Sequence, residues 1–177
     1  MALAGKKIAL FVENLYQEIE VWYPYYRMKE AGADIVFIGP EKGAVYESKY
    51  DYPVKAEMGI NEADIAMFDA LIIPGGYAPD MMRRNKKMIE FVRAMDGAGK
   101  IVTAICHAGW MLTSADIVRG KKVTSFSAIA DDMKHAGGEW RDEEVVRDGN
   151  LITSRKPDDL PAFCRTIIQA LEERSAP

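Results

Sequence analysis

Apolar runs alternate with helical patterns along this chain, and this alternation limits its fold more than any other feature. Short apolar runs that predict buried strands occupy residues 8–12, 35–38, 68–73 and 101–105. Helical patterns occupy residues 18–31, 86–98 and 107–115. Repeated strand–helix units favour a mostly parallel sheet with helices on both faces. We therefore expect an α/β fold, a three-layer sandwich, in which sites form beyond the carboxyl ends of the strands.

The first predicted helix carries Ile19, Trp22 and Tyr26 on one stripe. After it, residues 39–64 are rich in Gly, Tyr and Lys and predict a small excursion or hairpin, and residues 123–125 predict a short strand. Near the carboxyl end, Asp148-Gly149 separates two apolar runs and indicates a hairpin turn.

A last helix is expected to begin near Asp158, as its N-cap. Its apolar residues share one buried stripe: Leu160, Phe163, Cys164, Ile167, Ile168 and Leu171. Cys164 is therefore predicted to be a core residue without chemistry. Because no linker or repeat interrupts the pattern, we expect one domain over residues 1–177.

Composition narrows the possible partners and compartments. The 177-residue chain has a formal net charge of -4 with both signs interspersed, and it lacks the basic patch that nucleic-acid binding requires. No apolar run is long enough to cross a membrane, and no secretion signal is recognisable. Two cysteines without disulfide-like spacing fit a reducing, cytoplasmic compartment. We expect neither a nucleic-acid nor a membrane partner.

Cys106 stands between the apolar run 101–105 and the small residues that begin the next helix. A strand that turns sharply into a helix at a thiol is the geometry of a nucleophile elbow. Free backbone N–H groups and the positive end of the helix dipole then favour the thiolate. The alternative is that Cys106 is a small buried hydrophobic residue, as free cysteines usually are.

Gly75 and Gly76 follow another predicted strand and can present backbone N–H groups to the same edge of the sheet. With the N–H of His107, these groups would form an oxyanion hole beside Cys106. The other histidine, His135, lies four residues after Asp131, but two ligands do not make a metal site. We expect neither a metal ion nor any other cofactor.

Several segments together resemble the PfpI family of intracellular cysteine proteases, over about residues 6–172. The resemblance is carried by Cys106-His107, by Pro74-Gly75-Gly76-Tyr77-Ala78-Pro79-Asp80, and by residues 23–30, 131–133, 136–140, 144–150 and 153–160. The family includes glyoxalase and deglycase relatives and belongs to the class I glutamine amidotransferase-like superfamily. The resemblance implies a flavodoxin-like sheet and an assembly of dimers or rings of dimers.

The resemblance also implies roles for individual residues. Cys106 would carry out the chemistry. His107 would be the histidine that directly follows this cysteine in the family, and Asp80 of a neighbouring subunit would complete a triad. A family glutamate that hydrogen-bonds the sulfur aligns with Gln17, or with Glu18 after a one-residue slip. Gln17 can donate a hydrogen bond but cannot transfer a proton, whereas Glu18 can do both.

Two functions follow from these residues. In the first, the Cys106 thiolate attacks the carbonyl of a 2-oxoaldehyde such as methylglyoxal, of a glycated protein adduct, or of a peptide bond. In the second, an oxidisable Cys106 serves a non-catalytic redox sensor or a chaperone-like stress protein. An amidotransferase would need a late histidine, which residues 153–160 lack.

Overall fold

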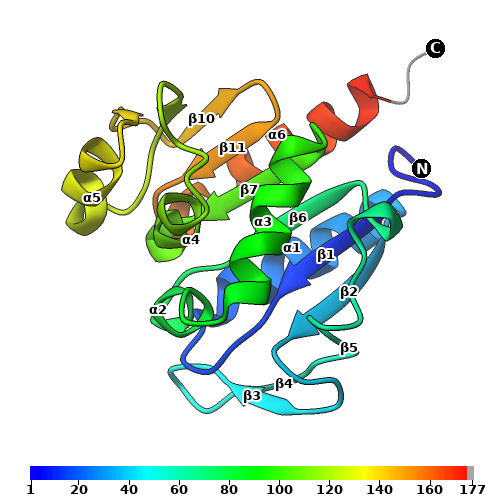
Figure 1. Cartoon of the computed structure of the whole chain (residues 1–177). Coiled ribbons are helices and arrows are strands. Elements are labelled where there is room, and N and C mark those ends of the chain that lie inside the picture. The colour runs from blue at the N-terminus through cyan, green and yellow to red at the C-terminus, as the bar shows by residue number, and fades with distance from the viewer. Residues whose placement is uncertain (175–177) are drawn as a thin grey trace.

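In the computed structural model, which describes residues 1–174, seven strands form one sheet in the order β10-β11-β7-β6-β1-β2-β5 (Figure 1). The strands are β1 (Lys7–Phe11), β2 (Asp34–Gly39), β5 (Met58–Gly59), β6 (Ala70–Ile73), β7 (Ile101–Ile105), β10 (Val145–Asp148) and β11 (Leu151–Ser154). Every pair is parallel except β10 and β11, which form the hairpin predicted at Asp148-Gly149. The expected mostly parallel sheet is confirmed.

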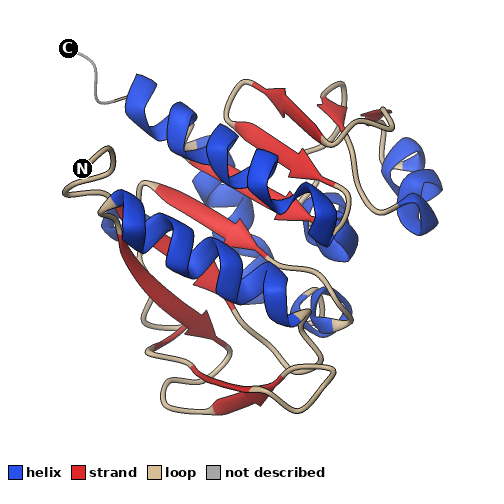
Figure 2. Ribbon diagram, turned by 180° about the vertical axis from the view of Figure 1, so that it is seen from behind, coloured by secondary structure: helices blue, strands red, loops and turns tan. Residues whose placement is uncertain are grey.

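Helices cover both faces of this sheet. On one face lie α1 (Glu18–Ala31) and α6 (Leu160–Glu173), which run side by side in Figure 2. The opposite face carries α3 (Lys86–Gly97) and α4 (Gly109–Ser114), and α3 crosses in front of the sheet in Figure 1. The three-layer arrangement follows from strands such as β6 and β7, whose residues are buried throughout.

Smaller elements lie around this framework. Residues 39–64 contain the predicted excursion, a hairpin of β3 (Val45–Glu47) and β4 (Pro53–Lys55). The strand expected at 123–125 is the shorter β8 (Lys122–Val123), which pairs with β9 (Glu139–Trp140). Two further helices, α2 (Ala78–Met82) and α5 (Ala130–His135), are short, and single 3-10 turns occur at Ile65–Met67, Cys106–Ala108, Ser127–Ile129 and Pro157–Asp159.

Two helices differ from expectation in detail. Of the stripe of Ile19, Trp22 and Tyr26, Ile19 and Tyr26 lie on the outer side of α1, 50% and 62% exposed, whereas Trp22 is partly buried against the core. Helix α6 is preceded by Asp159 rather than Asp158, and the Asp159 side chain accepts a hydrogen bond from Arg155 instead of capping the helix. The predicted stripe of α6 is buried, and Cys164 is a core residue.

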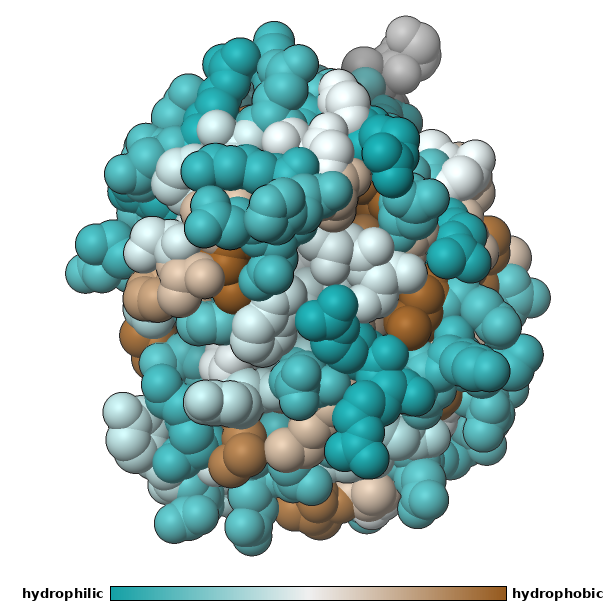
Figure 3. Space-filling view, turned by 60° about the vertical axis from the view of Figure 1, so that its left-hand side comes forward, coloured by the Kyte–Doolittle hydropathy of each residue, from teal (hydrophilic) through white to brown (hydrophobic). Residues whose placement is uncertain are grey.

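The surface shows no single large apolar face in the view of Figure 3, where hydrophobic residues occur in small groups among hydrophilic ones. No helix within residues 1–174 is long and apolar enough to span a membrane. Strands β1, β6 and β7 are neighbours in the sheet, so their carboxyl ends lie at one common edge of it. The loops that follow these ends build the site.

Candidate active site

Cys106 occupies the turn from β7 into α4. Its φ is +63°, a left-handed conformation that residues with a side chain rarely adopt. The residue is only 8% exposed, and a 3-10 turn over Cys106–Ala108 joins it to the helix. The structure thus has the sharp strand–turn–helix geometry of an elbow, with strain stored at the cysteine.

The glycine turn after β6 approaches this elbow closely. A Cβ on Gly75 would lie 2.7 Å from the Cβ of Cys106 and 2.6 Å from a carboxylate oxygen of Glu20, so only glycine fits. Gly76 has a φ of +79°, which favours glycine as well. The backbone N–H groups of Gly76 and His107 point at the Cys106 sulfur. These are two of the three N–H groups that the sequence suggested for an oxyanion hole.

The third group, the N–H of Gly75, is bonded to another residue, so the prediction that it contributes to the oxyanion hole is corrected. This N–H donates to Oε2 of Glu20 over 2.7 Å. Glu20 lies in the first turn of α1, is fully buried, and faces the Cys106 thiol, which acts to lower the pKa of its carboxyl. Its other oxygen, Oε1, is buried without a hydrogen-bond partner in the described part of the chain. A buried carboxyl therefore faces the thiol, a contact that the sequence analysis did not foresee.

The prediction that Gln17 or Glu18 contacts the sulfur was wrong. Gln17 lines the pocket, and its backbone N–H donates to the carbonyl of Gly75 over 3.2 Å. The Glu18 carboxylate turns away, toward the β3–β4 hairpin, where it accepts hydrogen bonds from the Ser48 hydroxyl and the Tyr50 N–H. Two residues further on, Glu20 is directed into the sheet edge.

Burial raises the pKa of the Glu20 carboxyl to about 7, although the N–H of Gly75 and the thiol of Cys106 act to lower it. Burial first and the charge of Glu20 second raise the pKa of the Cys106 thiol to about 12. The predicted preference for thiolate is therefore reversed while Glu20 is ionised. When Glu20 carries a proton, its charge no longer opposes the thiolate, and burial remains as the main cause that keeps the thiol pKa high.

His107 is turned toward the nucleophile, which adjacency in sequence alone could not establish. Its Nδ1 lies 3.3 Å from the Cys106 sulfur. The ring stacks on Phe126 and meets the edge of Trp110, with 5.1 Å between ring centroids in each pair. Burial first, then the positive charge of Lys49, lowers the pKa of His107, so the imidazole is neutral near pH 7.

Asp80 does not join these groups within one chain. It lies exposed in the first turn of α2, and its side chain forms no hydrogen bond or ion pair with any of residues 1–174. A triad through a second subunit stays a prediction.

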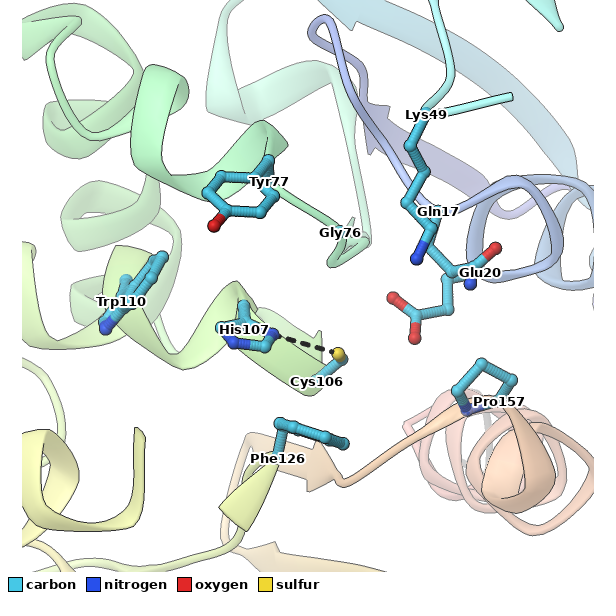
Figure 4. Close-up of a pocket in the computed structure, with 10 residues that line it drawn as sticks. All are labelled: Gln17, Glu20, Lys49, Gly76, Tyr77, Cys106, His107, Trp110, Phe126 and Pro157. Atoms are coloured by element: carbon cyan, nitrogen blue, oxygen red, sulfur yellow. Dashed lines mark hydrogen bonds between the residues drawn. The ribbon is translucent and has the colours of Figure 1, made fainter. Parts of the chain in front are cut away.

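A pocket of about 320 Å³ opens over Cys106 (Figure 4). Its lining consists of Gln17, Glu20, Lys49, Gly76, Tyr77, Cys106, His107, Trp110, Phe126 and Pro157. Tyr77 and Trp110 lie on the side of His107, whereas Gln17, Glu20 and Lys49 lie on the opposite side. No group of three or more His, Cys, Asp or Glu side chains in the described region is arranged to hold a metal ion. The site therefore presents a thiol, a proton-exchanging carboxyl and two backbone N–H groups to a small ligand.

Residues 6–170 match the model of the DJ-1/PfpI family. The deglycase PfpI of Pyrococcus furiosus is 42% identical over 166 residues, which cover 94% of this chain and 99% of that protein. Protein/nucleic acid deglycase 2 of Escherichia coli is 39% identical over 169 residues, covering 94% and 98% of the two chains.

Among solved structures, a two-domain protein from Anabaena variabilis with DJ-1/ThiJ/PfpI-like and ferritin-like domains superposes with a TM-score of 0.92 and 41% identity. The match covers 94% of this chain and 48% of that one, so this chain spans about half of the two-domain protein.

Proposed function

This chain belongs to the DJ-1/PfpI family, and from that premise we propose that its Cys106 attacks the aldehyde carbon of small 2-oxoaldehydes such as methylglyoxal, or of their adducts on proteins. The observation that carries this proposal is the contact between the buried Glu20 carboxyl and the Cys106 thiol. A thiol paired with a carboxyl whose pKa is about 7 has a proton acceptor and donor suited to neutral pH.

The first step forms a carbon–sulfur bond. Ionised Glu20 takes the thiol proton as the Cys106 sulfur attacks the aldehyde carbon, and the electron pair of the carbonyl moves to its oxygen. The N–H groups of Gly76 and His107, which point at the sulfur, are placed to hold that oxyanion. Return of the proton to the oxygen gives a hemithioacetal and restores the Glu20 carboxylate.

The second step moves a proton between carbons. The Glu20 carboxylate removes the hydrogen of the former aldehyde carbon as a proton, and the electron pair moves through a new C=C bond to the ketone oxygen, which gives an enediolate. Glu20 returns this proton to the former ketone carbon, and the O–H proton of the former aldehyde carbon passes to the alkoxide oxygen, which leaves a thioester of a 2-hydroxy acid. The aldehyde carbon is oxidised and the ketone carbon is reduced, so no external oxidant is needed. Water then cleaves the thioester, and methylglyoxal plus water has become lactate.

Three further properties belong to the same proposal. Residues 1–177 act as one PfpI-like domain, since the sheet takes strands from both halves of the chain. The protein works as a homo-oligomer, dimer or ring of dimers, and a triad of Asp80 with His107 would require the second subunit. It acts in the cytoplasm, where the free thiols Cys106 and Cys164 stay reduced.

Lactate formation from methylglyoxal tests the proposal, with wild type measured beside Cys106→Ser. We expect lactate from wild type and a loss of at least about a hundredfold in the variant, because the oxygen nucleophile is far less ionised at neutral pH. Folding of both proteins is checked by thermal unfolding. A folded wild type that forms no lactate, but whose Cys106 is selectively oxidised by mild peroxide, would replace this function with redox sensing.

A further inference from the structure

Lys49 brings a positive charge to the pocket that the reaction described above does not use. It belongs to the loop between β3 and β4, is exposed, and lines the same pocket as Cys106. Its ammonium group lies 5.4 Å from the ring centroid of Tyr50. It forms no ion pair with a carboxylate anywhere in residues 1–174.

The loop holds this lysine in place. The N–H of Lys49 donates to the carbonyl of Tyr16 over 3.1 Å. Next to it, Ser48 is buried, and its hydroxyl oxygen accepts hydrogen bonds from the N–H groups of Tyr50 and Tyr52. Glu18 accepts from Ser48 and Tyr50, which ties the loop to the start of α1. The position of Lys49 over the pocket is therefore fixed by the backbone, and only its side chain is free to adjust.

The charges around the pocket do not balance. Among the described residues that line the pocket, Glu20 is the only Asp or Glu, and its carboxyl faces the Cys106 sulfur. His107 is the other basic lining residue and is held neutral by its burial. Lys49 acts on both groups through its charge, so it is close enough to act on a ligand there.

The opposite side of the pocket is aromatic. Tyr77 and Trp110 lie across from Lys49 in Figure 4, and Phe126 lies beneath His107. These rings carry no charge, so an anionic group on a ligand is attracted toward Lys49. Methylglyoxal has five non-hydrogen atoms and fills only part of a pocket of about 320 Å³.

On the premise of the function above, we propose that Lys49 is a specificity-determining residue that binds an anionic group of the substrate, so that the site favours 2-oxoaldehydes bearing a carboxylate. A substrate of this class is 4,5-dioxopentanoate, in which the carboxylate stands two methylene groups from the ketone. With water it gives 2-hydroxyglutarate, by the same internal oxidation and reduction that converts methylglyoxal to lactate.

Alkylation of Cys106 tests the attraction of anions without requiring turnover. Iodoacetate and iodoacetamide react with a thiolate in the same way but differ in charge, and mass spectrometry reads the modification at Cys106. Their rate ratio cancels any change in the thiolate fraction. We expect Lys49→Gln to lower the iodoacetate/iodoacetamide ratio by about three- to tenfold, as for a partly exposed ion pair. Lys49→Arg should restore the ratio, and high salt should reduce it in wild type.

Lys55→Gln is the matched control, because it removes the same charge from β4 at an exposed lysine that does not line the pocket. Its ratio should stay at the wild-type value. An equal ratio in wild type and Lys49→Gln, or an equal fall in Lys55→Gln, would overturn the proposal.

Turnover tests the substrate class. Wild type should convert 4,5-dioxopentanoate with a higher kcat/KM than its neutral methyl ester, and Lys49→Gln should remove this preference mainly through KM. Cys106-dependent lactate formation without any preference for the free acid would overturn this inference and leave the proposed function standing. A loss of lactate formation itself would instead count against the function, while the alkylation ratio would still decide whether Lys49 attracts anions.

Discussion

The carboxyl group of Glu20 lies against the thiol of Cys106, although one residue lies in the first turn of α1 and the other directly follows the central strand β7. Gly75 stands between them and makes this approach feasible, since its N–H binds one carboxylate oxygen and its missing side chain leaves room for both groups. Burial keeps the carboxyl partly protonated near pH 7. The pair therefore couples the ionisation of the nucleophile to a proton that is available for catalysis.

The pKa of Cys106 should fall when the charge of Glu20 is removed. Glu20→Gln keeps the size of the side chain but abolishes the negative charge, which is the second cause that raises the thiol pKa. The pH profile of Cys106 alkylation by iodoacetamide should therefore shift to lower pH in this variant. Glu18→Gln is the control, because Glu18 binds Ser48 and Tyr50 instead of the sulfur. A wild-type profile in Glu20→Gln would contradict the coupling.

The free energy of unfolding should depend on pH through Glu20. Its pKa is about 7 in the folded protein against 4.5 for the free group, so the folded state binds the proton more tightly. The contribution of the protonated Glu20 carboxyl to the free energy of unfolding is fully present below pH 4.5 and is lost as the pH rises through 7. The loss is about 3 kcal/mol, since one pKa unit corresponds to ~1.4 kcal/mol.

Urea unfolding of wild type and Glu20→Gln at pH 5 and pH 8 measures this effect. The stability of wild type relative to Glu20→Gln should be greater at the lower pH. The same pH dependence in both proteins would show that Glu20 titrates with an ordinary pKa.

A side chain at position 75 should disrupt the site. In Gly75→Ala the new Cβ would meet Glu20 and Cys106 at 2.6 and 2.7 Å, so we expect about 1–3 kcal/mol of destabilisation and a large loss of activity. Thermal or urea unfolding and lactate formation measure the two effects. Gly97→Ala is the matched control, because nothing lies within 4 Å of its Cβ position and its substitution at the end of α3 should be neutral or stabilising.

Phe126 should determine the ionisation of His107. Phe126→Ala removes the ring that stacks on the imidazole and lets water reach it, so the pKa of His107 should rise toward its ordinary value of 6.5. Proton NMR can follow it, because the chain has only two histidines. An unchanged titration of His107 would show that Phe126 does not shield it.

The sheet and its site edge could be predicted because the relevant signals are local. Buried strands such as β6 and β7 appear as continuous apolar runs, and parallel strands end at a common edge. The elbow at Cys106 and the glycine turn at 75–76 could be located for the same reason. That these two segments meet was expected because both follow strands that end at this common edge.

Glu20 could not be recognised from the same signals. In α1 the stripe of Ile19, Trp22 and Tyr26 has the spacing of a buried face, yet Ile19 and Tyr26 are exposed and only Trp22 packs partly against the core, while the buried side includes a carboxylate. Hydrophobic periodicity assigns such a glutamate to the solvent side. Only the three-dimensional contacts with Gly75 and Cys106 show why it is buried. The pKa of Cys106 was misjudged because burial of the thiol raises it first and the charge of Glu20 second, and neither is visible in the sequence.

The rate of lactate formation from methylglyoxal by Glu20→Gln, with Glu18→Gln beside it, tests the role of the Glu20–Cys106 pair most directly. We predict that kcat falls about 10²- to 10⁴-fold in Glu20→Gln, the range typical of a lost general acid–base. Glu18→Gln should stay within a few-fold of wild type, because its carboxylate lies outside the reacting groups. A Glu20→Gln protein that folds and retains the wild-type kcat would contradict the account.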